Sequence, residues 1–499
     1  MTSFVRTDVP LRHTDRLFIG GEWVHPSTDA RIDVIDPATE ELYYRVAEAR
    51  DEDMSQAIAA ARTAFDSGPW PRLTPVERAD YLRAIAEALR RRSGDIAAIY
   101  PRQAGVLRSI AQASAAGAVG RFDFYADLAT SYQFEEPARP TAGGEFALIT
   151  RQPVGVVGAI IPWNAPLGLL TMKVAPALLA GCTVILKASP EAPGESYVMA
   201  EIAEEIGLPP GVLNVLTADR AVSERLVRDE RVDKIAFTGS TAAGRRIASL
   251  CGDRIARCTL ELGGKSAALV LDDADVASAG ETLARAECLM NGQVCSSLTR
   301  IIVGRSRHDE LVEALAATFA TVRIGDPYDP DSQIGPLVAN RQRERVEGYI
   351  AQGVQDGATV AAGGGRPKDL DRGWYVEPTV LGNVDNSARV AQEEIFGPVL
   401  CVIPADSEEH AIALANDSRY GLNASVFTRD VDHARAVARR LRTGTVGHNA
   451  FRSDLGLPFG GFKQSGIGRE GGRDGLYAYL ETQTVILDGV PSEYAPPAR

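Results

Sequence analysis

The sequence predicts an α/β protein with two doubly wound, Rossmann-like domains and a small β arm. In two successive stretches, 154–264 and 266–450, short apolar runs alternate with segments of helical periodicity, which is typical of parallel βαβ units. The length of 499 residues is enough for two such domains. A segment at 132–151 is extended and interrupted by Pro and Gly, which predicts a hairpin arm.

The N-terminal part is expected to alternate amphipathic helices with short strands. Its clearest helix start is Thr74-Pro75-Val76-Glu77, a capping box with Pro at the first helical position. Apolar residues follow at helical spacing and predict one buried face: Val76, Leu82, Ile85, Ala86 and Leu89.

The first α/β stretch predicts five strands separated by helices, at 154–162, 183–187, 212–216, 234–239 and 258–262. Its most apolar window, 167–186, is about long enough to span a bilayer but contains Lys173, Pro176 and Gly181. We interpret it as a buried helix followed by a buried strand.

The second stretch predicts strands at 266–271, 299–304, 399–404 and 446–450, with helices through 286, near 308–320 and near 339–356. The tail at 477–490 alternates like an edge strand that needs a partner. The chain then divides into a first domain (1–134 and 154–260), a second domain (261–465), and an arm with the tail (135–153 and 466–499).

Charge and cysteine content exclude several classes of function. The 53 Lys and Arg against 66 Asp and Glu give a net charge of −13, which disfavours nucleic acid and anionic membranes as partners. The N-terminus lacks the apolar stretch of a signal peptide. The six cysteines show no CxxC spacing, so we expect no metal site, no disulfide framework and reduced thiols in a cytoplasm.

Two segments are candidates for binding a nucleotide phosphate. The GxGxxG match at 466–471 follows no strand and leaves too little chain for a βαβ unit, so we interpret it as a Gly-rich loop. The segment 235–244 is better placed, because an apolar strand runs through Gly239 and Ser240 into a helix. Ser240 is equally suited to a purely structural helix cap.

Three further residues suggest acyl chemistry. Cys295 lies in a small polar turn, where a thiol can face a pocket, although a lone cysteine is usually an inert buried residue. Glu261 ends a buried strand before a Gly-Gly turn, and such a carboxylate is costly unless it is hydrogen-bonded or active in proton transfer. The Asn164 amide is placed to stabilise an oxyanion or to cap the next helix.

These motifs, in this order, resemble the aldehyde dehydrogenase superfamily, and the resemblance runs from FIGGEWV at 18–24 to the tail. It rests on PWN (162–164), FTGST (237–241), ELGGKS (261–266), NGQVC (291–295), GDPYDP (325–330), EEIFGP (393–398) and PFGGFKQSGIGRE (458–470). Seven separate motifs are far more specific than any one of them.

The resemblance implies NAD(P)-dependent oxidation of an aldehyde to its acid. Cys295 corresponds to the nucleophile that forms a thiohemiacetal and then a thioester, with Asn164 and the Cys295 N–H holding the oxyanion. Glu261 corresponds to the base that activates water. Lys173 and Glu470 match residues that relay protons from this base, and a buried salt bridge is the alternative interpretation.

The resemblance also implies cofactor contacts. They fall on Ile160, Ile161, Pro162, Trp163, Lys187, Gly239, Ser240, Leu262, Gly263, Glu394 and Phe396. Many NAD-using members carry a carboxylate three residues after the lysine, whereas this chain has Pro190 there and Glu191 next. The segment 215–227 also lacks the family's Gly-rich loop. NAD is therefore expected as the cofactor, with NADP as the alternative.

The substrate tunnel is expected to be wide and apolar. Aromatic residues that narrow it in acetaldehyde-type relatives are replaced by Ala165 and Met172, with Leu169 and Val294 nearby. This favours a bulky terpenoid, cyclic or aromatic aldehyde, while Arg452 leaves open a substrate with an acidic group. The arm and tail resemble elements exchanged in homodimers and homotetramers.

Three alternatives stay open. A CoA-acylating dehydrogenase would pass the thioester to a thiol, but such relatives commonly lack the base that Glu261 provides. A non-catalytic protein of the same fold would be expected to have lost Cys295, Glu261 or Asn164. A Cys-dependent hydrolase would need a histidine partner, and none of the six histidines lies in a recognisable motif.

Overall fold

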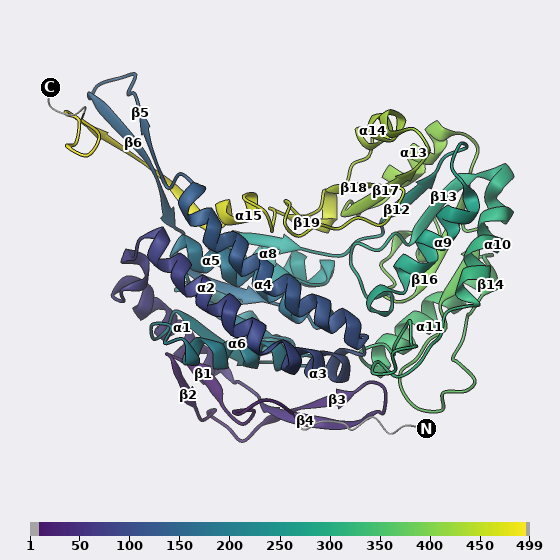
Figure 1. The fold of residues 1–499 in the computed structure, drawn as a ribbon, viewed down its shortest axis with the longest axis horizontal. Coiled ribbons are helices and arrows are strands. Elements are labelled where there is room, and N and C mark those ends of the chain that lie inside the picture. Colours follow the sequence, from purple (N-terminus) through teal and green to yellow (C-terminus); the bar gives the residue numbers. More distant parts are fainter. Residues whose placement is uncertain (1–8, 496–499) are drawn as a thin grey trace.

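The computed structural model describes residues 9–495 and contains two large, mainly parallel sheets, each covered by helices (Figure 1). The first comes mostly from the N-terminal half of the chain and the second from the C-terminal half (Figure 1). The α/β fold with two sheet-centred bodies and a small β arm is therefore confirmed.

The N-terminal strands precede the helices instead of alternating with them. The strands are β1 (Leu17–Ile19), β2 (Glu22–Val24), β3 (Arg31–Asp36) and β4 (Glu41–Ala47). The helices that follow are α1 (Asp51–Asp66), η1 (Trp70–Arg72), α2 (Pro75–Arg91), α3 (Ser93–Ala104) and α4 (Arg108–Ser131). The expected alternation is wrong because the turn Gly20-Gly21, with φ of 66° and 87°, folds β1 directly back onto β2 as a hairpin.

The capping box of α2 is confirmed, but one residue of its predicted buried face is wrong. The Thr74 side chain accepts a hydrogen bond from Glu77 N, and Leu82, Ile85, Ala86 and Leu89 are buried. Val76 is 50% exposed. At about 100° per residue it lies roughly 120° around the helix from Leu82, outside the apolar stripe.

The first sheet has the strand order β19-β11-β10-β7-β8-β9-β1-β2. Its parallel strands are β7 (Val156–Ile160), β8 (Thr183–Ala188), β9 (Leu213–Thr217), β10 (Lys234–Thr238) and β11 (Arg257–Glu261). The connecting helices are α5 (Pro166–Ala180), α6 (Gly194–Glu205), α7 (Arg220–Arg228) and α8 (Thr241–Asp253). All five predicted strands are present, and 167–186 is a buried helix and strand as expected.

Both faces of this sheet are buried, as a doubly wound sheet requires. Val157 and Val184 join the core formed with α2, α4, α5 and α6. Val156 and Ile185, which are their chain neighbours, join the core formed with α1, α7 and α8. The strands are continuously apolar because alternate side chains enter different cores.

The second sheet has the order β14-β15-β16-β13-β12-β17-β18. Its strands are β12 (Ala267–Val270), β13 (Arg300–Gly304), β14 (Thr359–Ala362), β15 (Thr379–Gly382), β16 (Val399–Ala405), β17 (Asn423–Phe427) and β18 (Thr445–His448). The helices of this half are α9 (Val276–Glu287), η2 (Leu289–Gly292), η3 (Arg305–Arg307), α10 (His308–Phe319), α11 (Asn340–Gln355), α12 (Arg389–Gln392), α13 (Glu408–Asn416) and α14 (Val431–Ala438). The predicted strands and helices of this stretch are present, with bounds shifted by a few residues.

The remaining elements are β5 (Glu135–Ala138), β6 (Phe146–Pro153), η4 (Lys463–Ser465), β19 (Gly466–Ile467), α15 (Asp474–Tyr477) and β20 (Leu480–Leu487). β5 and β6 form the expected hairpin, which projects from the body at the upper left of Figure 1. β20 is the tail strand, and it pairs with β6 from Leu480–Pro153 to Leu487–Phe146.

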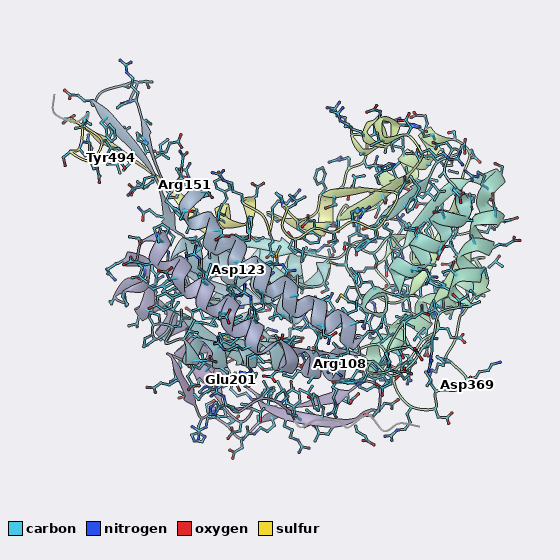
Figure 2. The ribbon with its side chains drawn as sticks, in the orientation of Figure 1. Arg108, Asp123, Arg151, Glu201, Asp369 and Tyr494 are labelled. Atoms are coloured by element: carbon cyan, nitrogen blue, oxygen red, sulfur yellow. The ribbon has the colours of Figure 1, made fainter. Side chains whose placement is uncertain are left out.

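The arm is closed by contacts between distant segments. Arg151 and Tyr494 both lie on the arm (Figure 2), and the Tyr494 hydroxyl donates to Glu135 of β5 at 3.1 Å. The loop interpretation of 466–471 is wrong for Gly466–Ile467, which form a short strand antiparallel to β11, and only the residues after them are irregular. This strand joins the first sheet. The division of the chain into two domains and an arm, with the boundaries given above, stays a prediction.

Among the helices of residues 9–495, none is both long and apolar enough to cross a membrane.

Candidate active site

Neighbouring strands bring three of the predicted segments together. β7, β10 and β11 are parallel and adjacent, so their carboxyl ends meet at one edge of the first sheet. β7 leads into Ile161 and Asn164, β10 into Gly239 and Ser240, and β11 ends at Glu261. This edge is where open α/β sheets bind ligands.

At this edge lies a cavity of about 200 Å³, which we call the thiol cavity. It is lined by Pro162, Trp163, Asn164, Thr238, Gly239, Ser240, Leu262, Cys295, Gln342, Arg345, Glu394 and Phe396. The lining residues from Pro162 to Leu262 belong to the half of the chain that forms the first sheet. Cys295 and the lining residues after it belong to the half that forms the second sheet. The two halves thus share one site.

Cys295 lies at the end of a loop with an unusual backbone. Met290 and Asn291 have φ of 49° and 61°, the left-handed region that ordinary residues rarely adopt. The buried Asn291 side chain holds this shape: its amide donates to Gly105 O and Pro336 O at 2.8 Å, and its Oδ1 accepts from Gly335 N at 2.7 Å. The loop is therefore fixed before any ligand binds.

The Cys295 thiol is half-buried and protonated at neutral pH. Burial raises its pKa to about 12, and the carboxyl groups of Glu394 and Glu261 act in the same direction. Two backbone N–H groups, those of Cys295 and Ser296, partly oppose this shift. A nucleophilic role thus requires a further positive charge or a base near the sulfur.

Asn164 faces the same cavity and does not cap α5. The N-cap position is Ala165, which has no side-chain cap, so the capping interpretation is wrong. The Asn164 Nδ2 donates to Gln293 O at 3.0 Å, two residues before the cysteine. This bond fixes one amide hydrogen and leaves the other for a ligand.

Glu261 is buried behind the thiol cavity and is not among the residues that line it. Its side chain is 2% exposed, and neither carboxylate oxygen has a hydrogen-bond partner among residues 9–495. Burial and the neighbouring Glu470 raise its pKa well above the usual value. The carboxyl packs against Gly460, where an added Cβ would lie 2.7 Å from Glu261 Oε1.

Lys173 and Glu470 form a buried ion pair beside Glu261. The Lys173 ammonium donates to the two Glu470 oxygens at 2.7 and 3.0 Å and to Thr238 Oγ1 at 2.6 Å. The two side chains are 0% and 2% exposed. The charge of Lys173 lowers the pKa of Glu261 while that of Glu470 raises it, so the pair is electrostatically coupled to Glu261.

Within residues 9–495, no three His, Cys, Asp or Glu side chains are grouped closely enough to hold a metal ion.

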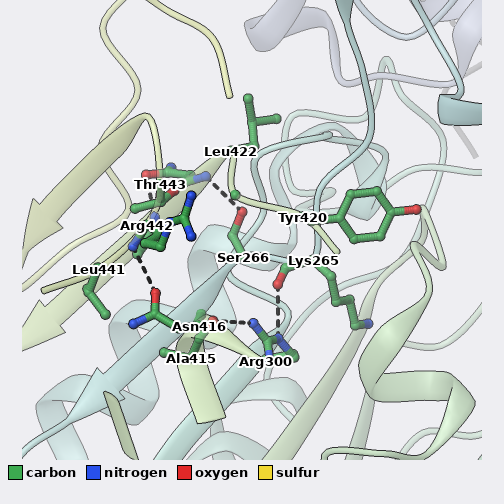
Figure 3. Close-up of a pocket in the computed structure, with 14 residues that line it drawn as sticks. Lys265, Ser266, Arg300, Ala415, Asn416, Tyr420, Leu422, Leu441, Arg442 and Thr443 are labelled. Carbon is green, nitrogen blue, oxygen red and sulfur yellow. Dashed lines mark hydrogen bonds between the residues drawn. The ribbon is translucent and has the colours of Figure 1, made fainter. Parts of the chain in front are cut away.

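Another cavity, lined by Lys265, Arg300 and the segment 420–424 among others, is too small for a substrate (Figure 3). Its volume of about 20 Å³ has room for about one water molecule. The Arg300 guanidinium donates to Lys265 O at 3.0 Å and to Leu414 O and Ala415 O at 2.9 Å, so these carbonyls are already satisfied.

Comparison with known proteins identifies the family. The model of the aldehyde dehydrogenase family matches residues 23–485. The chain belongs to this family. Geranial dehydrogenase of Castellaniella defragrans is 46% identical over 95% of this chain and 98% of its own. A 3-succinoylsemialdehyde-pyridine dehydrogenase of a Pseudomonas species is 40% identical over 95% and 99%. A crystal structure of a Mycobacterium tuberculosis aldehyde dehydrogenase complexed with NAD+ superposes with a TM-score of 0.93, at 43% identity over 97% of this chain and 99% of that one.

Most cofactor residues expected for an aldehyde dehydrogenase line the thiol cavity: Pro162, Trp163, Gly239, Ser240, Leu262, Glu394 and Phe396. Ile160, Ile161, Lys187 and Gly263 lie outside its lining. Gly263 lies directly behind the cavity wall. A Cβ at this position would lie 2.5 Å from Oε2 of Glu394, which lines the cavity. The Ser240 side chain does cap α8, accepting from Ala243 N at 3.3 Å, while the residue also faces the cavity.

Gln342 and Arg345 of α11 also line the cavity and were not predicted. Gln342 Nε2 donates to Phe396 O at 2.7 Å, and Arg345 Nη2 donates to Glu394 O at 2.6 Å. They therefore hold the segment 394–396, in which Phe396 has a φ of 65°. In the sequence, Gln342 and Arg345 lie on a polar helix like many surface residues, so the sequence gives no sign that they line a cavity.

The expected tunnel residues fall into three groups. Met172 is buried with Leu422 and Phe459 in a small apolar cluster, and Cys295 and Leu455 pack against it. Arg452 is exposed and lines a different cavity beside α4. Ala165, Leu169 and Val294 are half-buried and line neither cavity.

Proposed function

We propose that this aldehyde dehydrogenase oxidises an aldehyde to the carboxylic acid with NAD+, by a hydrolytic route through Cys295 and Glu261. The observation that supports this most is the arrangement of one thiol, one amide and one partnerless buried carboxyl around a single site. Each has the chemistry that one step of acyl transfer requires.

In the first step, ionised Glu261 takes the proton of the Cys295 thiol, and the resulting thiolate adds to the aldehyde carbon to give a thiohemiacetal. The free Asn164 amide hydrogen and the Cys295 N–H stabilise the oxyanion that forms on the former carbonyl oxygen. Trp163, Ser240 and Phe396 would help to hold NAD+, which would supply the acceptor for the hydride lost by that carbon. The carbon is thereby oxidised, and the acyl group remains on Cys295 as a thioester.

In the second step, ionised Glu261 removes a proton from water, and the hydroxide attacks the thioester carbon. The carbon–sulfur bond breaks, which releases the acid and restores Cys295. A proton held by Glu261 can leave through the adjacent Lys173–Glu470 pair. The raised pKa of Glu261 makes its ionised form a stronger base toward water.

The walls of the site fit NAD+. Trp163 and Phe396 meet edge to face at 5.3 Å and leave aromatic surface beside Cys295. Glu394 is a half-buried acceptor for a ribose hydroxyl, with one hydrogen bond from Gly264 N at 3.1 Å and a pKa raised to about 7 by desolvation. The Lys187 ammonium has no hydrogen-bond partner among residues 9–495 that the structure records, and burial lowers its pKa to about 8.

NAD rather than NADP is supported by Glu191. Its charge acts on Lys187, so the two side chains are close although Glu191 is displaced by one residue from the family position. A carboxylate there accepts from the ribose 2′-hydroxyl and repels a 2′-phosphate. NADP stays the alternative.

We also propose a bulky apolar substrate, of the terpenoid, cyclic or aromatic kind. The apolar cluster of Met172, Leu422 and Phe459 beside Cys295 supports it. So do the relatives, one named for geranial and one for a pyridine-bearing aldehyde.

The arm supports a homodimer or homotetramer. Apolar side chains of β20 and the segment after it are exposed at its end: Ile486, Leu487 and Val490. Such side chains are normally covered in an assembly. All six cysteines are free, which is compatible with the cytoplasm that we propose as the site of action.

The test is NADH formation at 340 nm with small, aromatic and terpenoid aldehydes, using NAD+ and NADP+ in parallel. We expect turnover without CoA, fastest with bulky aldehydes and NAD+, and none with Cys295→Ala. Turnover only when CoA is present would favour the acylating reaction. If no aldehyde is turned over under any of these conditions, the alternative of a non-catalytic protein would be favoured.

A further inference from the structure

A large cavity beside α4 is not used in the reaction described above. It has a volume of about 770 Å³ and is lined by Gly117, Gly120, Arg121, Phe124, Tyr125 and the segment 451–456. We call it the α4 cavity. Gly117, Gly120, Arg121 and Phe124 follow the i, i+3, i+4, i+7 spacing, so they form one face of the helix. The two glycines keep this face open, since a Cβ at Gly120 would meet no atom within 4 Å.

Two arginines face the α4 cavity without a carboxylate partner. Arg121 Nη1 donates to Thr171 Oγ1 at 3.1 Å, and its guanidinium lies against Gly117. Burial lowers its pKa, and the only group that opposes this shift is Tyr125. Within residues 9–495 no ion pair is recorded for Arg121 or for Arg452, which lies opposite on the segment 451–456.

Many other arginines in residues 9–495 have acidic partners, including exposed ones such as Arg45 and Arg305. The Arg121 guanidinium is half-buried and has one neutral acceptor, so its other N–H groups are available to a ligand in the cavity. The one carboxylate on the cavity wall, Asp454, accepts from Gly456 N at 2.8 Å.

The α4 cavity adjoins the apolar wall of the reaction site. Leu455 lines the cavity and also packs against the cluster that contains Met172 and contacts Cys295. Thr171, the acceptor for Arg121, directly precedes Met172 on α5. A molecule held at Cys295 by its aldehyde can thus extend past an apolar stretch toward the two arginines.

We propose that the α4 cavity is a subsite for a carboxylate at the far end of the aldehyde substrate, with Arg121 and Arg452 as the residues that bind it. Arg121 is held in place by Thr171 and offers a planar pair of donors that matches a carboxylate. Arg452 is exposed and adds a second positive charge. The apolar stretch between the two sites binds the body of the substrate. This inference rests on the proposed function and narrows its substrate class to an aldehyde with a bulky apolar body and a carboxylate at the far end.

The test compares a chain-length series of ω-carboxy aldehydes with their methyl esters and with unsubstituted aldehydes of equal length. We expect kcat/KM to be highest for one length of the carboxylate series. Arg121→Met should lower kcat/KM for that substrate roughly 10- to 100-fold, the range for a hydrogen bond to a charged group, and leave the ester within about twofold. Arg452→Ala should act in the same direction and less strongly.

Three controls separate the inference from its alternatives. Arg435→Met, on exposed α14 and outside the α4 cavity, should change neither substrate. Arg121→Lys keeps the charge and should retain part of the carboxylate preference, which a folding defect would not do. Gly120→Leu should fill the open face and reduce kcat/KM for long substrates of both kinds.

Equal kcat/KM for carboxylate and ester at every length, or equal losses for both in Arg121→Met, would overturn the inference. Turnover of terpenoid aldehydes by the same preparation would then leave the proposed function intact. If no aldehyde of any kind is oxidised with NAD+, the proposed function itself fails.

Discussion

Replacing Glu470 with Gln tests the buried ion pair at the centre of the site. Lys173 is 0% exposed and keeps only Thr238 Oγ1 and a neutral amide as partners after the change. Breaking a buried pair by removing one charge costs about 3–5 kcal/mol. Because Gln can still accept a hydrogen bond from Lys173, we expect the lower end, about 3 kcal/mol of lost unfolding free energy.

Urea denaturation followed by tryptophan fluorescence measures this loss against wild type and against Lys173→Met/Glu470→Leu. The double variant removes both charges and keeps similar volume, so it should recover at least half of the lost stability. A loss in Glu470→Gln below about 0.5 kcal/mol, typical of an exposed pair, would refute the reasoning. So would a double variant less stable than the single one.

The same variant has a kinetic signature. Glu470 raises the pKa of Glu261 and Lys173 lowers it, so neutralising Glu470 moves the pKa of Glu261 down. The water-activating form of Glu261 is the ionised one, and the acid limb of the rate profile for thioester hydrolysis should therefore move to lower pH. An acid limb that stays at the same pH, or moves to higher pH, would contradict the electrostatic coupling between Glu470 and Glu261.

Three further outcomes follow from single contacts. With a pKa of about 12, Cys295 in the cofactor-free protein should react with iodoacetamide about tenfold faster per pH unit up to pH 9, and a plateau below pH 8 would contradict that value. Gly460→Ala places a Cβ 2.7 Å from Glu261 Oε1 and should slow thioester hydrolysis about 100-fold. Acylation of Cys295 should still proceed, and a pre-steady-state burst of NADH would show it. Glu191→Gln removes the carboxylate that pairs with Arg341 at 2.5 Å, and should raise the kcat/KM ratio of NADP+ to NAD+ at least about tenfold; an unchanged ratio would place 2′-hydroxyl recognition elsewhere.

Continuous apolar runs made the sheets predictable. The expected strand at 183–187 is β8 (Thr183–Ala188), in which every residue is buried, and such a strand needs no knowledge of its partners to be recognised. The N-terminal hairpins were missed because their strands are short and mixed in polarity. Val76 lies off the buried face because an apolar side chain at the first turn of a helix need not fall within the apolar stripe.

The site was predictable where motifs carry it and not where it depends on distant packing. Cys295, Asn164 and Glu394 lie in recognisable segments, and they share one cavity. Gln342 and Arg121 lie on ordinary helices, and their roles depend on which segments the fold brings against them. The lack of partners around Glu261 likewise follows from burial by chain segments far apart in sequence, such as Gly460.

The central claim is that Cys295 carries the acyl group and that Glu261 is needed to release it. The most direct measurement is rapid mixing of Glu261→Gln with NAD+ and a bulky aldehyde, followed by intact-mass analysis after acid quench. The account predicts a burst of one NADH per subunit and a matching acyl adduct on the peptide that contains Cys295, with little turnover afterwards. Steady turnover at the wild-type rate, or a burst with the adduct on another residue, would contradict it.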